Sequence, residues 1–248
     1  MSDDADDAAA RTAHDFVDTM VPQWEARLGA ELIGISLIGS LAHGGFSARY
    51  SDIDVALVTQ DGLAPDTLEA LRAQAVARST ELAPKLSFFW ADRGFTRGRF
   101  PPLDRADYLD HGIALLERER VLPPRPLLAD LRQYLAGAPL ANWRERAERF
   151  AADATLEPKD RKPFLRALLY PARFAYSFMT GRMASNDVAV GWVRDRAVPG
   201  IEYDLIARAL ACRKANADPD PLFADRSVLL QQIAACAQLV ANSEATSR

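Results

Sequence analysis

Leu37-Ile38-Gly39-Ser40 is followed, one short loop later, by Ser51-Asp52-Ile53-Asp54-Val55, and these two stretches decide the fold of the chain. The first is typical of a strand that ends in a glycine turn, and the second of a strand that returns beside it. Side chains at positions i and i+2 of a strand point to the same face. The carboxylates of Asp52 and Asp54 are therefore expected to point together, while Ile53 and Val55 face a core.

Two carboxylates beside a glycine turn suit Mg²⁺, a hard cation that takes oxygen ligands from protein and phosphate together. The pattern therefore predicts a nucleotide-phosphate site in which Asp52 and Asp54 are metal ligands. Plainer interpretations stay open, because the aspartates could form a surface turn that caps a strand and Ser40 could be a helix N-cap. His43, in the intervening loop, could contact phosphate or base, or could simply be exposed to solvent.

Hydrophobic periodicity predicts further elements around these two strands. In chain order they are a helix at 8–28, a strand at 31–38, a loop with or without a short helix at 41–50, a strand at 52–59, an amphipathic helix at 65–81, an aromatic strand at 85–91 and a loop at 95–110. Strand, turn, strand, helix and strand, in this order, indicate a small α/β core.

No segment after about residue 126 has a strand pattern. Apolar residues instead recur at helical spacing in segments separated by glycine or proline. These expected helices lie at 127–135, 143–154, 161–180, 185–197, 203–215 and 226–241. The sequence therefore predicts an α+β fold, with a small mixed-sheet domain at 1–120 followed by an all-helical domain at 121–248.

The composition is that of a soluble globular protein, with 49% hydrophobic and 26% charged residues. A formal net charge of −4 argues against nucleic acid as a partner and suits a cationic small substrate. The acidic N-terminus is unlike a signal peptide, and no apolar run reaches membrane-spanning length, so we expect a cytoplasmic protein without a membrane partner. Cys212 and Cys236 are too few for a disulfide framework and are expected to be buried, inert thiols.

The two motifs resemble the signature of the DNA polymerase β-type nucleotidyltransferase superfamily, in which a Gly-Ser turn precedes an Asp-x-Asp strand. Gly39-Ser40 and Asp52-Ile53-Asp54 match that signature at a compatible separation. The helical half is similar to aminoglycoside adenylyltransferases of the streptomycin/spectinomycin type, and 110–116 is similar to the helix that follows their nucleotide domain. The matching residues of the helical half are Arg166-Ala167-Leu168-Leu169, Arg173, Thr180-Gly181-Arg182, Ser185, Ala189, Trp192 and the run 206–210.

This resemblance implies ATP as the donor substrate, Mg²⁺ as the cofactor and a small hydroxyl-bearing molecule as the acceptor. It implies nucleotide-binding roles for Gly39, Ser40, Ser51 and Ser185. It also implies that Asp52 and Asp54 are catalytic because they hold the metal. Domain 1–120 would then be the nucleotidyltransferase domain, and domain 121–248 would lie on the substrate side.

The sequence departs from the family pattern at two positions. A third carboxylate on the neighbouring strand usually completes such a site as metal ligand or base. Here Ser87 lies near its expected position, so Asp92, at the end of the strand, becomes the third candidate catalytic residue. In addition, Asn186 stands where the related enzymes carry a phosphate-contacting lysine.

Two hypotheses about function follow from the residues and the resemblance. The first is a Mg²⁺-dependent nucleotidyltransferase that moves a nucleoside monophosphate, AMP from ATP, to a hydroxyl of a small molecule such as an aminoglycoside. The second is a non-catalytic or regulatory nucleotide-binding protein that retains the fold but lacks the third active-site carboxylate.

Overall fold

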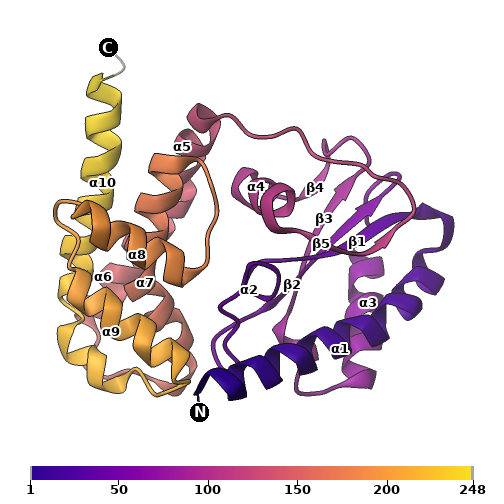
Figure 1. Cartoon of the computed structure of the whole chain (residues 1–248), viewed down its shortest axis with the longest axis horizontal. Helices are drawn as coiled ribbons and strands as arrows, with labels where there is room; N and C mark the ends of the chain where they lie inside the picture. Colours follow the sequence, from indigo (N-terminus) through magenta and orange to yellow (C-terminus); the bar gives the residue numbers. More distant parts are fainter. Residues whose placement is uncertain (1, 247–248) are drawn as a thin grey trace. The chain divides into compact units, whose positions relative to one another are not determined.

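The computed structural model describes residues 2–246 and divides into two compact units, Met1–Pro126 and Leu127–Arg248 (Figure 1). The first unit contains a five-stranded mixed sheet with helices. Every regular element described in the second unit is helical. The predicted α+β class is therefore confirmed, and the two units divide after Pro126 rather than after residue 120.

The elements of the first unit follow the predicted order with additions near its end. They are α1 (Ser2–Leu28), η1 (Gly29–Glu31), β1 (Leu32–Ile38), α2 (Ser40–His43), β2 (Ile53–Thr59), α3 (Pro65–Arg78), η2 (Ala83–Lys85), β3 (Leu86–Asp92), β4 (Gly98–Arg99), α4 (Pro102–His111) and β5 (Ile113–Glu117). The first helix begins at Ser2 rather than at residue 8.

The sheet has the strand order β4-β3-β2-β1-β5. Strands β2 and β3 run parallel, and the other neighbouring pairs are antiparallel. In the β1–β2 register Ile38 lies opposite Asp54. Because the glycine turn directly follows Ile38, this register brings the Gly-Ser turn to the start of β2, beside the Asp-x-Asp sequence.

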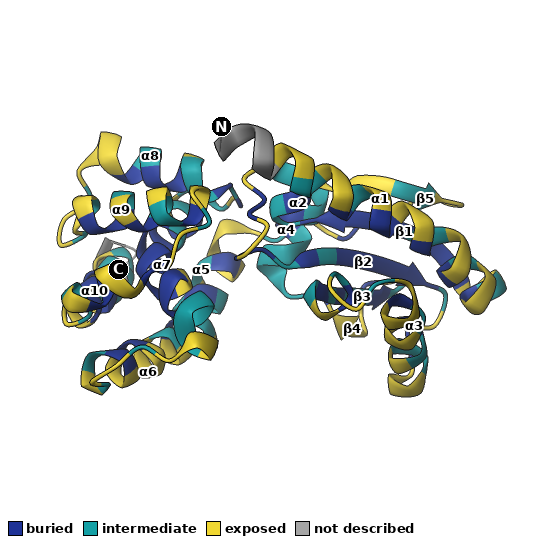
Figure 2. Cartoon of the chain, turned by 90° about the horizontal axis from the view of Figure 1, so that it is seen from below, coloured by how far each residue is buried: buried dark blue, intermediate teal, exposed yellow. Residues whose placement is uncertain are grey.

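The two faces of the sheet are covered by different helices (Figure 1). On one face, α1 and α3 contribute apolar side chains such as Trp24 and Leu71 to a core with Val55 of β2. On the other face, Ile38 and Ala56 pack in a second cluster, in the company of aromatic residues from β3, α4 and the loop between them. Alternation along β2 thus buries both faces, and Figure 2 shows β1 and β2 as buried over most of their length.

Two predictions for residues 95–116 are wrong. Residues 95–110 are not a loop, because they contain the short strand β4 and the helix α4. Pro102 occupies the first turn of α4, where a missing amide hydrogen does no harm. Residues 113–117 form the edge strand β5 rather than a helix, because they pair with β1. That pairing depends on residues distant in sequence and leaves little periodicity within the strand itself.

In the helical unit, the other helices pack around one central helix, α7. Its elements are α5 (Leu128–Ala136), α6 (Ala138–Ala152), η3 (Pro158–Asp160), α7 (Arg161–Thr180), α8 (Asn186–Arg196), α9 (Tyr203–Lys214), η4 (Asp220–Asp225) and α10 (Val228–Thr246). Phe164, Leu168, Phe174 and Phe178 of α7 are buried, as their helical spacing predicts. Met179, in contrast, is 46% exposed and is not part of that core.

The cysteines and the membrane prediction have simple outcomes. Cys212 and Cys236 are not joined in a disulfide. Cys236 is buried as expected, and burial raises the pKa of its thiol to about 12, whereas the expected burial of Cys212 is wrong because this residue is partly exposed. Among the described residues, no helix combines the length and apolar character needed to cross a membrane.

Candidate functional site

Gly39 joins the two motifs in space. Its backbone has φ +68° and ψ −155°, a conformation that is essentially restricted to glycine. A β-carbon added at Gly39 would lie 2.3 Å from Oδ2 of Asp54, which is much closer than any van der Waals contact. The turn therefore requires glycine twice, for its backbone conformation and for the space that the Asp54 carboxylate occupies.

The Asp-x-Asp sequence has the alternation that was predicted. Ile53 and Val55 are fully buried in the core beneath α1 and α3, whereas Asp52 and Asp54 are partly exposed. Asp54 and its neighbours on the same face, including Ala56, thus point away from that core. The register carries Asp54 directly beside the end of β1.

These two carboxylates fit a magnesium ion better than they fit a closed metal cage. Magnesium is usually bound by one or two protein carboxylates together with substrate phosphates and water. Within residues 2–246, no three His, Cys, Asp or Glu side chains are grouped so that they could hold a metal by themselves. Asp52 and Asp54 would therefore hold the ion and leave its remaining positions to phosphate oxygens.

Ser40 and Ser51 connect the glycine turn to the segment before Asp52. The hydroxyl of Ser40 donates a hydrogen bond to Oγ of Ser51 at 3.0 Å, and the amide of Ser47 donates to the same oxygen at 2.9 Å. Ser51 is only 3% exposed. Since Gly39 occupies the N-cap position of α2, Ser40 is not the N-cap, and its hydroxyl instead holds the two motifs together.

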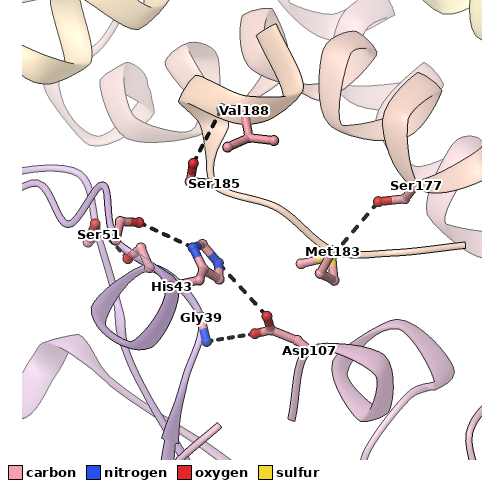
Figure 3. Close-up of polar contacts among 10 residues, drawn as sticks. Gly39, His43, Ser51, Asp107, Ser177, Met183, Ser185 and Val188 are labelled. Carbon is pink, nitrogen blue, oxygen red and sulfur yellow. Dashed lines mark hydrogen bonds and ion pairs between the residues drawn. The ribbon is translucent and has the colours of Figure 1, made fainter. Parts of the chain in front are cut away.

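Asp107 of α4 is a buried carboxylate at this turn that the sequence analysis missed. Its Oδ2 accepts a hydrogen bond from the amide of Gly39 at 2.7 Å, and its Oδ1 lies 4.0 Å from Nε2 of His43 (Figure 3). Asp107 is 2% exposed, and the imidazole ring of His43 lies against that of His111 with centroids 5.5 Å apart. Asp107 could have been recognised as an aspartate on the buried face of a helix, next to Ala106. The sequence did not show this, because 95–110 was predicted to be a loop.

The structure contradicts the expectation that Asp92 supplies the third carboxylate. Asp92 pairs with Thr59, at the opposite end of β2 from Asp54, about 16 Å away at about 3.3 Å per residue. Asp92 is also five strand positions beyond Ser87, an odd number, so its side chain lies on the other face of the sheet from Ser87 and Asp54. Its carboxylate accepts hydrogen bonds from the amides of Thr96 and Arg97 at 2.7 and 2.8 Å, and the Arg97 bond is the main reason that its pKa is lowered. Asp92 therefore organises the turn after β3.

Ser87 lies where the third carboxylate was expected. In the parallel register it is directly opposite Asp54, and therefore on the same face of the sheet. The next residue along β3 on that face is Phe89, which packs in the second apolar cluster. This part of β3 thus places a hydroxyl group, and not an acid, next to Asp54.

Ser185 belongs to the helical unit and begins α8. Its hydroxyl accepts a hydrogen bond from the amide of Val188 at 3.3 Å, which is the geometry of a helix N-cap (Figure 3). Asn186 is the first residue of the helix. The structure thus gives Ser185 a structural role, and its contribution to nucleotide binding remains a prediction.

The fold is similar to that of a solved adenyltransferase structure. One solved structure with this fold is spectinomycin adenyltransferase AAD(9) from Enterococcus faecialis, crystallised with ATP and spectinomycin. It matches this chain with a TM-score of 0.64 and 14% sequence identity, over 91% of this chain and 98% of the other. No protein-family model and no curated protein matches the sequence. The likeness is therefore one of fold.

Proposed function

We propose that this protein is a Mg²⁺-dependent nucleotidyltransferase that transfers AMP from ATP to a hydroxyl group of a small molecule. The observation that carries this proposal is the direct approach of the Gly39 turn to the Asp54 carboxylate. A glycine turn without a side chain beside metal-binding oxygens is an arrangement that suits a triphosphate with its bound magnesium.

The residues of the turn and of β2 have distinct roles in this reaction. Ser40 offers its amide to phosphate oxygens, while its hydroxyl donates to Ser51 and so holds Ser40 in place. Asp52 and Asp54 would hold the magnesium ion, which when bound would neutralise charge on the phosphate oxygens during in-line attack. The acceptor oxygen forms a bond to the α-phosphorus, the bond to the bridging oxygen breaks, and pyrophosphate leaves.

The hydroxyl at Ser87 does not prevent this chemistry. Phosphoryl-type transfer depends mainly on positioning and on electrostatic stabilisation, because its transition state is loose and needs little covalent help from the protein. A base would add to the rate, but its absence leaves the metal-binding and phosphate-binding residues intact. We therefore expect slow but measurable turnover, with the acceptor proton released to solvent.

An aminoglycoside of the streptomycin or spectinomycin type is the proposed acceptor. The similar protein AAD(9) was crystallised with ATP and spectinomycin, and the match to AAD(9) extends over both units of this chain. The net charge of −4 is compatible with a cationic acceptor. These two observations support the class of acceptor and are the reason to begin a screen with aminocyclitol antibiotics.

The test is a transfer assay with ATP labelled at the α-phosphate, Mg²⁺ and a panel of aminoglycosides. We expect a labelled acceptor and pyrophosphate with the wild type, and a loss of at least about a hundredfold in rate with Asp52→Asn. Asp61→Asn is the matched control, because Asp61 lies in an exposed bend beyond the opposite end of β2. Transfer that survives Asp52→Asn unchanged would contradict the proposed role of the carboxylate.

The same preparation separates an enzyme from a nucleotide-binding protein without catalysis. Calorimetry with Mg²⁺ and a non-hydrolysable ATP analogue measures binding independently of transfer. Binding without transfer to any acceptor would favour the non-catalytic hypothesis, and absence of both would exclude the two hypotheses together.

A further inference from the structure

Helix α2 is attached to α4 by one buried carboxylate. Gly39, at the N-terminus of α2, donates its amide hydrogen to Oδ2 of Asp107 at 2.7 Å. His43, the last residue of α2, places Nε2 4.0 Å from the other oxygen, Oδ1. Asp107 thus faces both ends of the short helix that begins at the Gly-Ser turn (Figure 3).

The burial of Asp107 needs an explanation. A carboxylate removed from water is unfavourable unless it is hydrogen-bonded or paired. Asp107 is 2% exposed, and no group among residues 2–246 donates a hydrogen bond to its Oδ1. The Gly39 amide binds Oδ2, and the His43 ring lies near Oδ1. Both of these contacts are with α2 and the glycine turn before it, so the free-energy cost of burying the Asp107 carboxylate is offset at this turn.

The hydrogen bond also determines what the turn offers to a ligand. Because the Gly39 amide is already used by Asp107, this amide is directed toward α4 rather than toward a phosphate. The amides of Ala42 and His43 both donate to the Gly39 carbonyl, so the turn amides left to face phosphate oxygens are those of Ser40 and Leu41. Asp107 therefore fixes which atoms of the turn are presented, and it holds Gly39 in the positive-φ conformation that makes room for Asp54.

We propose that Asp107 is a positioning residue for the nucleotide, which holds the Gly39 turn in the conformation that accepts the triphosphate. This inference rests on the proposed function and extends it to a residue outside both motifs. Asp107 does not touch the reacting atoms. It acts through the Gly39 amide, and the acceptor oxygen that it presents to this amide is the essential feature.

Three variants test the inference by calorimetry with Mg²⁺ and a non-hydrolysable ATP analogue. Asp107→Leu has nearly the same shape but no acceptor, so we expect binding weakened by about tenfold or more, the range for hydrogen bonds to charged groups. Asp107→Asn keeps an oxygen for the Gly39 amide and should bind within about threefold of the wild type. Asp110→Asn is the matched control on α4, because Asp110 pairs with the exposed Arg125 and should bind like the wild type.

A second measurement reports on the hydrogen bond itself. Amide hydrogen exchange at Gly39 should be slow in the wild type and in Asp107→Asn, and at least about tenfold faster in Asp107→Leu. If the leucine variant does not fold, Asp107→Ala replaces it in both measurements, and the asparagine variant is compared with the wild type in either case.

The outcomes separate this inference from the proposed function. Wild-type binding that is unchanged in Asp107→Leu overturns the inference alone, as does an asparagine variant that is impaired as strongly as the leucine variant. Absence of nucleotide binding by the wild type overturns the proposed function, and the positioning role with it. Weakened binding in the leucine variant, restored by asparagine, supports the inference, since a general loss of stability would not follow the presence of an acceptor oxygen.

Discussion

At the scale of single residues, Gly39 sets the geometry of the candidate site. Gly39→Ala would place a methyl group against Oδ2 of Asp54 and force an L-residue into a conformation reserved for glycine. We expect the free energy of unfolding to fall by about 1–3 kcal/mol. Nucleotide binding should weaken by more than about tenfold, because Asp54 must move to accept the methyl group. Chemical denaturation and calorimetry with Mg²⁺ and an ATP analogue measure the two effects.

Gly44 provides a close control for this substitution. Its backbone, at φ +89° and ψ 169°, lies in the same glycine-only region, but an added β-carbon would meet no atom within 4 Å. Gly44→Ala should therefore lose a similar amount of stability and bind nucleotide almost normally. Equal loss of binding in both variants would mean that backbone strain, and not the space beside Asp54, explains the effect.

Ser87 supports a residue-scale prediction in the opposite direction. It is the direct neighbour of Asp54 across the parallel pair, in the position of the expected third carboxylate. Ser87→Asp should raise the rate constant for transfer, by about tenfold or more if the new carboxylate serves as a base. Measurement of kcat at saturating ATP tests this, with Ser87→Asn as a control of similar shape and no charge. A rate that does not rise would mean that the acceptor hydroxyl lies elsewhere.

At the scale of elements, Asp92 stabilises the turn after β3 rather than the candidate site. Its pKa is lowered below the ordinary 3.8, chiefly by the backbone hydrogen bond from Arg97 and also by Thr96. A lowered pKa in the folded state means that the carboxylate stabilises the fold above about pH 4 and loses this effect as the pH falls through its folded value. Asp92→Asn should therefore cost less than about 1 kcal/mol at pH 7.

Thermal unfolding from pH 7 to pH 3 measures this dependence. The difference between the wild type and Asp92→Asn should shrink as the pH falls below about 4, while transfer activity at pH 7 stays the same. Asp61→Asn serves again as the control, because Asp61 lies in a nearby exposed bend. A strong loss of transfer in Asp92→Asn would restore it as a catalytic residue and contradict the register of β2 and β3.

Helix α7 allows a second test at this scale, because two of its large apolar residues, Phe174 and Met179, differ in burial. Phe174 is 1% exposed and stacks on Phe178, with ring centroids 5.4 Å apart, whereas Met179 is 46% exposed. Phe174→Ala should reduce the free energy of unfolding by about 3–5 kcal/mol. Met179→Ala should change it by less than about 1 kcal/mol. Equal losses in chemical denaturation would contradict the arrangement of the helical core.

Local signals explain what could be predicted from the sequence and what could not. Strands β1, β2 and β3 were predicted because each is a compact apolar run next to a turn, and α7 was predicted from Arg161 to Thr180 because its apolar spacing is strong. Strand β5 and helix α4 were missed because neither has such a pattern. The edge strand is defined by its pairing with β1, which the intervening sequence does not encode locally.

The candidate site divides in the same way. The Gly-Ser turn and the Asp-x-Asp strand are motifs within one short stretch of chain, so their approach could be predicted. Asp107 lies 68 residues from the glycine whose amide it binds. No local pattern connects them, and only the packing of α4 against β1 brings them together. The prediction that Asp92 supplies the third carboxylate was wrong for the complementary reason. Asp92 is near Ser87 in the sequence, but five residues of extended strand separate it from Asp54 in space.

At the scale of the whole molecule, each of the two units has its own core, and residues 118–127 between their elements contain no helix or strand. The glycine turn, the carboxylates and Asp107 all belong to Met1–Pro126. A fragment of residues 1–126 should therefore fold cooperatively and bind an ATP analogue in the presence of Mg²⁺. Ser185 is outside the fragment, so we expect binding weaker than in the full chain and no transfer to an aminoglycoside.

Circular dichroism and calorimetry of the fragment test this expectation, with Asp52→Asn in the same fragment as the control for specific binding. Binding that depends on Asp52 would assign nucleotide recognition to the first unit, because all of its required groups are retained. A folded fragment that binds no nucleotide would show that the helical unit supplies an essential contact, which would make Ser185 and its neighbours at the start of α8 the first residues to substitute. An unfolded fragment would mean that the first core, although separate, depends on the second unit for its stability.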